Sequence, residues 1–473
     1  MCELIILVAA WFPPAPNEAP AWPQFRGPAG AGVASDDAQP PTQIGPDTNL
    51  KWKVAVPPGA SSPVVARDRI FITAFEDGKL FTIAYRQADG AELWRKQAPA
   101  AKIEPFEKTE GSPAASTPAT DGERLVAYFG SYGLICYDTA GKELWKHELP
   151  AGETFQGFGT GSSPVITGGR VVLLRDLERA GRLLCLDMTT GARVWETKRD
   201  GYRTSWGSAC VWDTPAGKQV VVAGGLRLQG YDLATGALVW TVTGLPSYQS
   251  TTPVVADGRL LYAGWSYGGS DEMKVPSFDD ILKDAGEVQL GYLTRAGSEK
   301  TMLKGHFDAS DPNKDGKITR QEWDAQVGYM TSGKNVALAL SPGGTGDVTR
   351  THVAWTVTRG LPYIPSPLVY RGLMYTVDKR GLLSAFEVKT GKEVYSRERV
   401  GLTGIYASPV AAHGHVYLCG LDGAVVVLRA GDKLARVCSA TLDDRIVATP
   451  AVAGNTLYIR TNKGLYAFTG SER

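Results

Sequence analysis

The chain lacks most of the features that mark a membrane, nucleic-acid-binding or disulfide-rich protein. Its 473 residues include 50 basic and 49 acidic side chains, and a net charge of +1 gives no electrostatic basis for binding nucleic acid or anionic lipid. No apolar run approaches the length of a membrane-spanning helix, so we expect no transmembrane segment. The six cysteines include no adjacent pair and no Cys-x-x-Cys motif, and we interpret them as small packed side chains.

The N-terminus has an incomplete export signal. Residues 3–12 form a short apolar core followed by Ala- and Pro-rich sequence, but no Lys or Arg precedes it. Cys2 comes before the apolar run, which is the wrong order for a lipid-attachment site. We therefore expect residues 1–21 to be an export signal and linker, and residues 22–49 a lead-in. The protein would be soluble and exported to the periplasm or cell envelope.

A hydroxyl residue followed by proline opens a unit that recurs along the chain. Each opening precedes two apolar runs joined by a Gly-bearing turn, and most units continue with a Thr-Gly-like turn and a strand carrying an aromatic residue. A period of roughly 40 to 50 residues with four short strands is typical of a β-propeller blade. The eight openings are Ser62-Pro63, Thr117-Pro118, Ser163-Pro164, the altered copy Ser208-Ala209, Thr252-Pro253, Ser366-Pro367, Ser408-Pro409 and Thr449-Pro450.

The last unit lacks its closing strand, and a matching strand precedes the first unit. The eighth unit stops at Phe468, whereas residues 50–54, which contain Trp52, belong to no other unit. A strand supplied from the N-terminus would complete the last blade and remove the free sheet edges. The sequence therefore predicts an all-β, eight-bladed propeller closed by an N-terminal strand. The other closing residues are Trp94, Trp145, Trp195, Trp240, Trp355 and Tyr395, with Val437-Cys438 in the seventh unit.

An insertion interrupts the fifth unit between its second and third strands. The propeller would span residues 50–267 and 335–473, and the charged, helix-compatible insertion residues 268–334. The insertion contains a sequence that matches an EF-hand loop at every ligand position. Calcium prefers about seven oxygen ligands, which this spacing supplies through side chains, one carbonyl and one water. The predicted ligands are Asp311, Asn313, Asp315, Lys317, Thr319 and Glu322, with Gly316 at the sharp turn.

EF-hands normally pair through a short strand at the position of Ile318. The upstream segment, residues 279–295, has no acidic ladder and no terminal Glu, so it indicates a lapsed or absent first hand. We therefore expect Ile318 to lack its usual partner. An unpaired hand should bind weakly, which favours a structural calcium over a signalling one. Phe307 and Trp323 should pack the two flanking helices together.

Propeller topology predicts where the insertion lies. The turn between the second and third strands shares a face with the segments that lead into each first strand, so the insertion should overhang the channel mouth. Aromatic residues with a few polar groups there would suit a ligand or peptide site. Alternatively, the aromatics plug the channel and pack between blades. This predicted rim comprises Phe158, Arg203, Trp206, Tyr248, Gln249, Tyr363 and Tyr406.

The repeat resembles that of the pyrroloquinoline-quinone-type (PQQ-type) propellers. The resemblance rests on the hydroxyl-Pro opening, the Leu-x-Cys segments at residues 134–138 and 183–187, the Thr-Gly turn and the closing Trp. It covers about residues 50–470 and the lead-in Trp-Pro-Gln-Phe-Arg-Gly-Pro at residues 22–28. This family includes quinoprotein dehydrogenases and the propeller lipoprotein of the outer-membrane barrel-assembly machinery, so the resemblance specifies fold better than function.

A PQQ-dependent member would be expected to carry a carboxylate base, a calcium and an Arg at the channel mouth, often with a vicinal disulfide. Here the segments before the inner strands hold Ser, Thr, Gly and aromatic residues, and the EF-hand motif is already fully ligated. We assign no catalytic residue. We favour a non-enzymatic binding or assembly scaffold for a protein or peptide partner. The alternatives are a PQQ-dependent quinoprotein oxidoreductase and a carbohydrate-recognition propeller.

Overall fold

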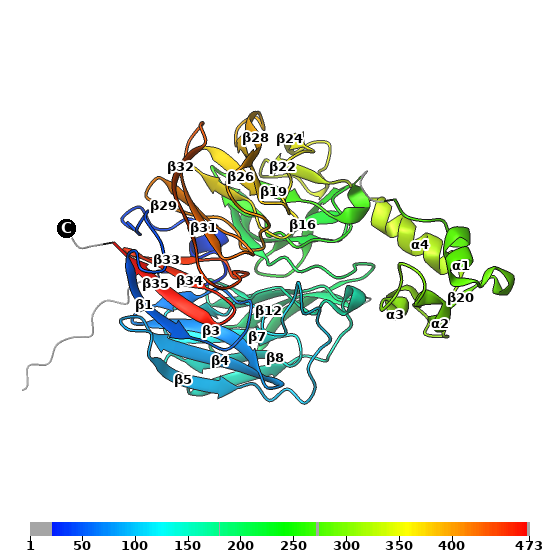
Figure 1. The fold of residues 1–473 in the computed structure, drawn as a ribbon, viewed down its shortest axis with the longest axis horizontal. Coiled ribbons are helices and arrows are strands. Elements are labelled where there is room, and N and C mark those ends of the chain that lie inside the picture. The colour runs from blue at the N-terminus through cyan, green and yellow to red at the C-terminus, as the bar shows by residue number, and fades with distance from the viewer. Residues whose placement is uncertain (1–20, 179, 271–273, 471–473) are drawn as a thin grey trace, which may run out of the picture.

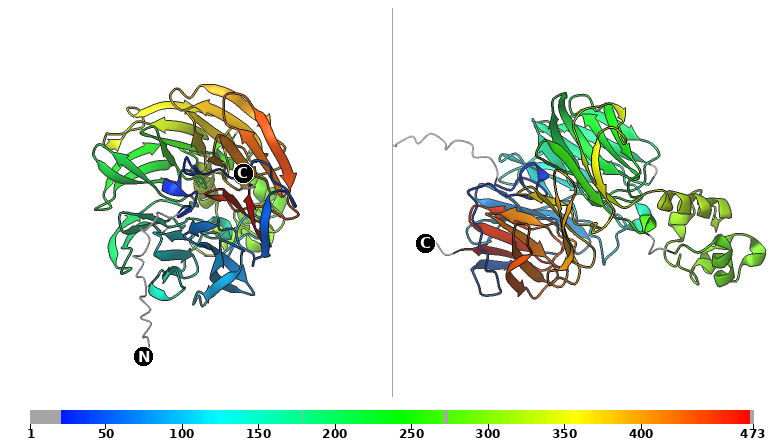
Figure 2. Two further views of the ribbon diagram at one scale, coloured as in Figure 1. Left: turned by 90° about the vertical axis from the view of Figure 1, so that its left-hand side faces the viewer. Right: turned by 90° about the horizontal axis from the view of Figure 1, so that it is seen from above.

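Eight β-sheets surround a central axis, and one group of helices projects from one end of that axis (Figures 1 and 2). This computed structural model describes residues 21–470 apart from residues 179 and 271–273. The predicted export signal therefore lies, except for its last residue, outside the described residues. The eight-bladed all-β fold is confirmed.

The first four blades follow one another along the chain, each with its strands in sequence order from the axis outward. Blade one contains β2 (Val64–Ala66), β3 (Arg69–Glu76), β4 (Lys79–Arg86) and β5 (Glu92–Gln97). Blade two contains β6 (Ala119–Thr120), β7 (Arg124–Phe129), β8 (Gly133–Asp138) and β9 (Glu143–Glu148). Blade three contains β10 (Val165–Thr167), β11 (Arg170–Arg175), β12 (Gly181–Asp187) and β13 (Arg193–Arg199). Blade four contains β14 (Cys210–Thr214), β15 (Gly217–Gly224), β16 (Arg227–Asp232) and β17 (Leu238–Thr243).

The remaining blades include the interrupted one and the one closed by the N-terminal strand. Blade five contains β18 (Val254–Ala256), β19 (Arg259–Gly264), β22 (Val336–Leu340) and β24 (Val353–Val357). Blade six contains β25 (Leu368–Tyr370), β26 (Leu373–Val377), β27 (Leu382–Glu387) and β28 (Glu393–Arg399). Blade seven contains β29 (Val410–Ala412), β30 (His415–Cys419), β31 (Ala424–Arg429) and β32 (Ala435–Thr441). Blade eight contains β33 (Ala451–Ala453), β34 (Thr456–Arg460), β35 (Gly464–Thr469) and β1 (Leu50–Ala55).

The hydroxyl residues that open the units form a chain of hydrogen bonds around the axis. In each link, the side-chain oxygen accepts the backbone N–H of the opening residue in the preceding blade, at 2.9–3.0 Å. Seven consecutive links run from Ser62 to Thr449. Because these backbone groups are buried and need partners, the repeat requires Ser or Thr at each opening. In the altered copy, alanine replaces the proline that follows the hydroxyl residue, yet the Ser208 N–H still donates to the Thr252 hydroxyl.

The closing tryptophans join neighbouring blades at their outer edges. The Trp145 indole N–H donates to the Met188 carbonyl of the next blade at 2.9 Å. Gly191 lies against the same ring at φ +69°, and a Cβ there would meet the indole at 2.6 Å, so only glycine fits. Trp94, Trp195, Trp355 and Trp52 make the equivalent bond to Thr139, Leu233, Val388 and Gln87. Trp240 instead bonds Gln219. The short strand β23 (Gly346–Asp347), from the connection between β22 and β24, pairs beside it with β17 and so joins the sheet of blade four.

The N-terminal strand closes the ring, as predicted. β1 pairs antiparallel with β35, and Trp52 lies opposite Ala467. Before this strand, the lead-in crosses the end of the channel that is opposite the helices (Figure 2). It contains the 3₁₀ turn η1 (Pro28–Gly30), and Phe25 faces the channel. Backbone hydrogen bonds tie it to Val65, Thr120 and Ala411 of blades one, two and seven. The Arg26 guanidinium donates to the Pro367 carbonyl of blade six.

The insertion is helical and contains the α-helices of the described residues. These are α1 (Phe278–Ala285), α2 (Arg295–Ser298), α3 (Phe307–Ser310) and α4 (Arg320–Thr331), with the 3₁₀ turns η3 (Tyr267–Gly269) and η4 (Val288–Leu290). The expectation that Ile318 lacks a partner is wrong: β20 (Leu293–Thr294) pairs with β21 (Lys317–Ile318), and Leu293 lies opposite Ile318. The upstream segment folds into a second helix–loop–helix because Phe278 and Ile281 share one apolar core with Phe307 and Trp323.

The cysteines within the described residues are free, and four of the five are buried. The fifth, Cys438, packs against the lead-in, where its sulfur accepts the Ile44 N–H at 3.4 Å. These contacts confirm the packing interpretation of the described cysteines. No helix in the described ranges combines the length and apolar character needed to cross a membrane.

Candidate functional site

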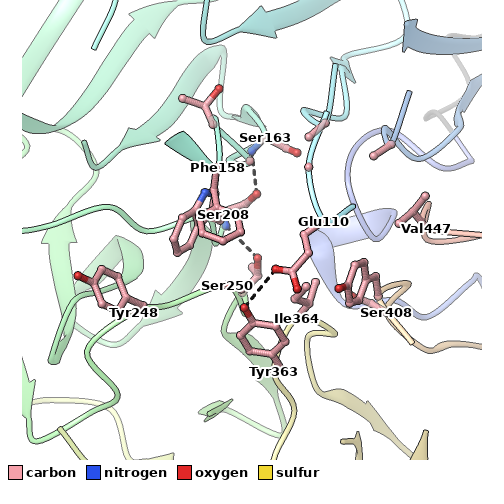
Figure 3. Close-up of a pocket in the computed structure, with 18 of the residues that line it drawn as sticks. Glu110, Phe158, Ser163, Ser208, Tyr248, Ser250, Tyr363, Ile364, Ser408 and Val447 are labelled. Carbon is pink, nitrogen blue, oxygen red and sulfur yellow. Dashed lines mark hydrogen bonds between the residues drawn. The ribbon is translucent and has the colours of Figure 1, made fainter. Parts of the chain in front are cut away.

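A cavity of about 400 Å³ lies on the propeller axis (Figure 3). Its wall includes the hydroxyl residues Ser62, Thr117, Ser163, Ser208, Thr252, Ser408 and Thr449, and Phe25 of the lead-in also faces it. Tyr267 and Gly268 of η3 and Met330 of α4 contribute to its lining at the insertion side. The cavity therefore lies between the lead-in and the base of the insertion.

The five predicted aromatic residues all line this cavity: Phe158, Trp206, Tyr248, Tyr363 and Tyr406. Four of them pack in two groups, mostly edge to face. In one, the centroid of Trp206 lies 6.1 Å from that of Phe158 and 6.3 Å from that of Tyr248. In the other, Tyr363 lies 5.6 Å from Tyr267. These rings pack against one another at the wall and leave an open space on the axis.

The two polar residues of the predicted rim do not line the cavity. Arg203 lies beside it, where its guanidinium is 3.4 Å from the Glu178 carboxylate and donates to the Tyr248 hydroxyl at 3.2 Å. Gln249 is 1% exposed, and its amide donates to the Pro246 carbonyl and accepts from Tyr262. Its place on the rim was wrong because neighbouring residues in extended backbone point to opposite sides, and Tyr248 takes the cavity side.

Glu110 is the functional candidate that the sequence pattern missed. It lies in the connection between β5 and β6, which carries no part of the repeat, so no periodic signal marked it. Its carboxylate accepts from the Tyr363 hydroxyl at 3.4 Å, and the two side chains point toward each other in Figure 3. Burial, together with the charge of Glu110, raises the pKa of both Tyr363 and Tyr406. Both phenols therefore remain protonated hydrogen-bond donors beside the carboxylate.

The loop at residues 311–322 has one buried oxygen without a partner. Asp311 is 2% exposed, and its Oδ2 accepts the Gly316 N–H at 2.9 Å, whereas its Oδ1 has no hydrogen-bond partner. Glu322 accepts from the backbone N–H and the hydroxyl of Thr319 and so caps α4. No three carboxylate, imidazole or thiolate groups of the described residues converge closely enough to hold a metal ion. An orphaned carboxylate oxygen nevertheless suits a cation, since burial without a partner is costly.

The loop before β20 is held together by hydrogen bonds between its own residues. Glu287 accepts from both the backbone N–H and the hydroxyl of Thr294, which are the bonds that Glu322 makes with Thr319. Residues 286–297 contain no ladder of oxygen-bearing side chains, so this loop lacks the ligands of a calcium site. It pairs with the second loop through β20 and β21.

The insertion contacts the propeller through the 311–322 loop itself and through α4. Lys314 forms an ion pair with Glu153, which precedes η2 (Phe155–Gly157). At the other end, the Tyr329 hydroxyl of α4 donates to the Ser247 carbonyl at 2.9 Å. Since Phe155 and Met330 both line the cavity, the insertion forms part of the wall beside the aromatics.

Comparison with solved structures places this fold beside BamB and beside alcohol dehydrogenases. BamB from Moraxella catarrhalis is similar with a TM-score of 0.52 and 16% identity, covering 89% of this chain and 98% of that one. A europium-containing methanol dehydrogenase gives a TM-score of 0.56 and 11% identity, covering 96% and 98%. The quinohemoprotein alcohol dehydrogenase ADHIIG from Pseudomonas putida HK5 gives 0.55 and 12%, covering 97% and 81%. At these identities the likeness shows the fold alone.

Sequence comparison is more specific. The outer membrane protein assembly factor BamB of Marinobacter adhaerens is 33% identical over 67 residues, which are 14% of this chain and 16% of that protein. The family model described as outer membrane protein assembly factor BamB matches residues 45–208, 81–270 and 304–472. Its matches extend over most of the propeller repeat and more than half of the chain. The chain therefore belongs to the family of the outer membrane protein assembly factor BamB.

Proposed function

We propose that the protein is an exported, non-enzymatic scaffold that binds a protein or peptide segment at the channel mouth. The observation that carries this proposal is the open cavity walled by the five predicted aromatics. Aromatic side chains are enriched at the centres of protein interfaces, and a concave apolar site with few polar groups suits a peptide anchor. Family membership supports an assembly role in the cell envelope.

The cavity does not suit PQQ, the cofactor of the alternative function. PQQ carries three carboxylates, so its site must supply cations. Among the described residues that line this cavity, none is cationic and the one charged residue is the acidic Glu110. A carboxylate facing a tricarboxylate is repulsive, especially where burial lowers the local dielectric. We therefore derive no redox step at this site.

We also propose that the loop at residues 311–322 binds calcium in a structural role. The buried, unpartnered Oδ1 of Asp311 supports this proposal, together with the oxygen-bearing side chains of Asn313, Asp315, Thr319 and Glu322 and the carbonyl of Lys317. The β20–β21 pairing supports it further, since paired loops are the usual EF-hand arrangement. Calcium would stabilise the apolar core around Phe307 and Trp323.

The calcium site is tested by titration of the purified full chain. Glu322→Gln removes one bidentate ligand while its amide can still accept from Thr319, so calcium affinity should fall at least tenfold. Asp324→Asn is the matched control, because Asp324 is exposed on the same helix and lies outside the loop. Equal calcium stoichiometry and affinity in the wild type and Glu322→Gln would remove the site.

The scaffold function is tested by crosslinked capture from the native envelope. A triple variant, Tyr248→Ala, Tyr363→Ala and Tyr406→Ala, removes cavity aromatics and should abolish the capture of specific partners. The matched control is Leu144→Ala, Val194→Ala and Leu238→Ala, which removes exposed side chains from the outer strands β9, β13 and β17. Far-ultraviolet circular dichroism confirms that both variants fold. Retained capture by the cavity variant would place the interface elsewhere.

A further inference from the structure

One negative charge lies inside an otherwise uncharged aromatic cavity. Of the described residues that line the cavity, Glu110 is the one with a charged side chain. No ion pair within 4.0 Å joins Glu110 to a described cation. Its contact at the cavity wall is the neutral phenol of Tyr363. The carboxylate therefore faces the cavity without a counter-charge.

The rings around Glu110 are also suited to a cation. Aromatic faces attract ammonium and guanidinium groups, and each such contact contributes about 0.5–2 kcal/mol, the larger values when the cation is desolvated. Two cations of the chain already lie against these rings from outside the cavity lining. Lys379 lies 4.5 Å from the centroid of Tyr267, and Arg445 lies 5.7 Å from that of Tyr406. Tyr267 and Tyr406 line the same cavity as Glu110.

The position of Glu110 is fixed by contacts of its loop. The Arg445 guanidinium donates to the Thr109 carbonyl at 2.6 Å, and the Gly111 N–H donates to the Glu107 carbonyl at 2.6 Å. A Cβ on Gly111 would meet the Phe158 carbonyl at 2.7 Å, so the loop packs closely against the aromatic wall. Contacts of its two neighbours in sequence, Thr109 and Gly111, thus hold Glu110 at the cavity.

On these grounds we infer that the cavity binds a positively charged side chain, lysine or arginine, from a partner peptide. This inference rests on the proposed scaffold function and specifies the chemistry of its partner. The ammonium or guanidinium group would pair with Glu110 and lie against Tyr363 and Tyr406, while its aliphatic stem packs on the aromatic wall. About 400 Å³ is enough for a side chain and its flanking backbone but not for a folded domain.

Other ligand classes fit the lining less well. An acidic peptide would be repelled by Glu110. A carbohydrate requires several directed polar partners, yet Glu110 and Gln156 are the carboxylate and amide side chains among the described lining residues. Several of the lining hydroxyls already accept a backbone N–H within the hydrogen-bond chain around the axis.

Calorimetric titration of the full chain with small probes tests the inference. The probes are acetyl-Gly-Lys-Gly-amide, its neutral norleucine counterpart, its glutamate counterpart, tetramethylammonium and maltotriose. We expect the lysine peptide to bind at least tenfold more tightly than every other probe. Its affinity should fall as sodium chloride rises, because a partly exposed ion pair is screened.

Two variants test whether the negative charge of Glu110 is responsible for binding of the lysine peptide. Glu110→Gln keeps the acceptor for Tyr363 and removes the negative charge, so it should weaken lysine-peptide binding about tenfold or more. Glu143→Gln is the matched control, since Glu143 is exposed on β9 away from the cavity. A thermal melt shows whether each variant is folded. The salt dependence of the wild type provides a second measurement that requires no substitution.

Four results would overturn the inference: equal affinity for the norleucine and lysine peptides, unchanged lysine-peptide affinity in Glu110→Gln, binding of tetramethylammonium without binding of the peptide, and preferential binding of maltotriose.

These failures can be distinguished from failure of the scaffold function. If the lysine peptide does not bind but the triple tyrosine variant loses envelope capture, the scaffold function stands and the cationic anchor is wrong. If the triple variant retains capture, the scaffold function itself fails at this site.

Discussion

Tyr329, near the end of α4, lies edge-on against Tyr248, with the two ring centroids 5.7 Å apart. The first ring belongs to the insertion and the second lines the cavity, so the helix that leaves the 311–322 loop contacts the candidate binding site directly. The Arg203 guanidinium lies 5.0 Å from the Tyr329 centroid and also bonds the Tyr248 hydroxyl. These contacts connect the proposed calcium site to the cavity wall through packed side chains.

The first prediction is that calcium strengthens partner capture through this contact. If calcium orders α4, a chelator should lower capture by the wild type about fivefold, at the low end of ordinary allosteric coupling. Tyr329→Ala removes the contact with Tyr248, so capture by this variant should be equal with and without calcium. Met302→Ala, an exposed change elsewhere in the insertion, should keep the calcium response. A chelator effect that persists in Tyr329→Ala would exclude this route.

The second prediction concerns the hydrogen-bond chain around the axis. Ser208→Ala leaves the buried N–H of Ser163 without its acceptor, which should lower the free energy of unfolding by about 1–3 kcal/mol. Ser208→Thr should restore most of this stability, because Thr117 and Thr252 make the same bond in other blades. Urea unfolding measures both variants. Equal losses for alanine and threonine would show that packing, not the hydrogen bond, decides.

The third prediction tests closure of the ring. Trp52 donates to the Gln87 carbonyl at 3.1 Å and packs 6.1 Å from the Tyr458 centroid, so it ties β1 to blades one and eight. Trp52→Ala should destabilise the protein by about 2–4 kcal/mol, somewhat below the value for a fully buried tryptophan. Lys51→Ala, on the exposed side of the same strand, is the control for urea unfolding. An unchanged midpoint for Trp52→Ala would mean that closure contributes little.

The blades could be predicted from sequence because each depends on a local pattern with a physical cause. Ser or Thr is required where a buried backbone N–H needs an acceptor, and Trp is required where its indole bonds the next turn. The closing N-terminal strand could be predicted because the eighth unit lacks its last strand and residues 50–54 belong to no other unit. By contrast, β23 has two residues, too few for alternation, and the lead-in crosses the channel without any repeat to mark it.

The site was predictable only in part. The aromatic residues precede the hydroxyl openings, so the repeat itself placed them at the cavity. Gln249 shows the limit of that argument, because adjacency in sequence does not fix which side of the backbone faces the channel. Glu110 shows another limit, since its connection has no counterpart in the repeat. Likewise, the lack of calcium ligands in the first loop was a poor guide to whether Leu293 pairs with Ile318. That pairing depends on the apolar core that the helices around both loops share.

The last prediction uses two glutamates on the loop that carries Glu110. Glu104 is 8% exposed, and burial raises its pKa although Thr160 donates to its carboxylate at 2.8 Å. A raised folded-state pKa means that the folded protein binds the proton more tightly than the unfolded chain. The stability from this group is therefore present below the unfolded pKa of about 4.3 and is lost as pH rises through the higher folded value.

Glu104→Gln should consequently gain stability relative to the wild type between pH 4 and pH 7, since the amide keeps the acceptor for Thr160 and cannot ionise. Glu107 provides the opposite case, because hydrogen bonds from the Thr109 N–H and hydroxyl lower its pKa. Glu107→Gln should therefore lose stability relative to the wild type over the same interval. Urea unfolding of the three proteins at both pH values measures the two differences. If they shift in the same direction, burial of the Glu104 carboxylate does not control its protonation.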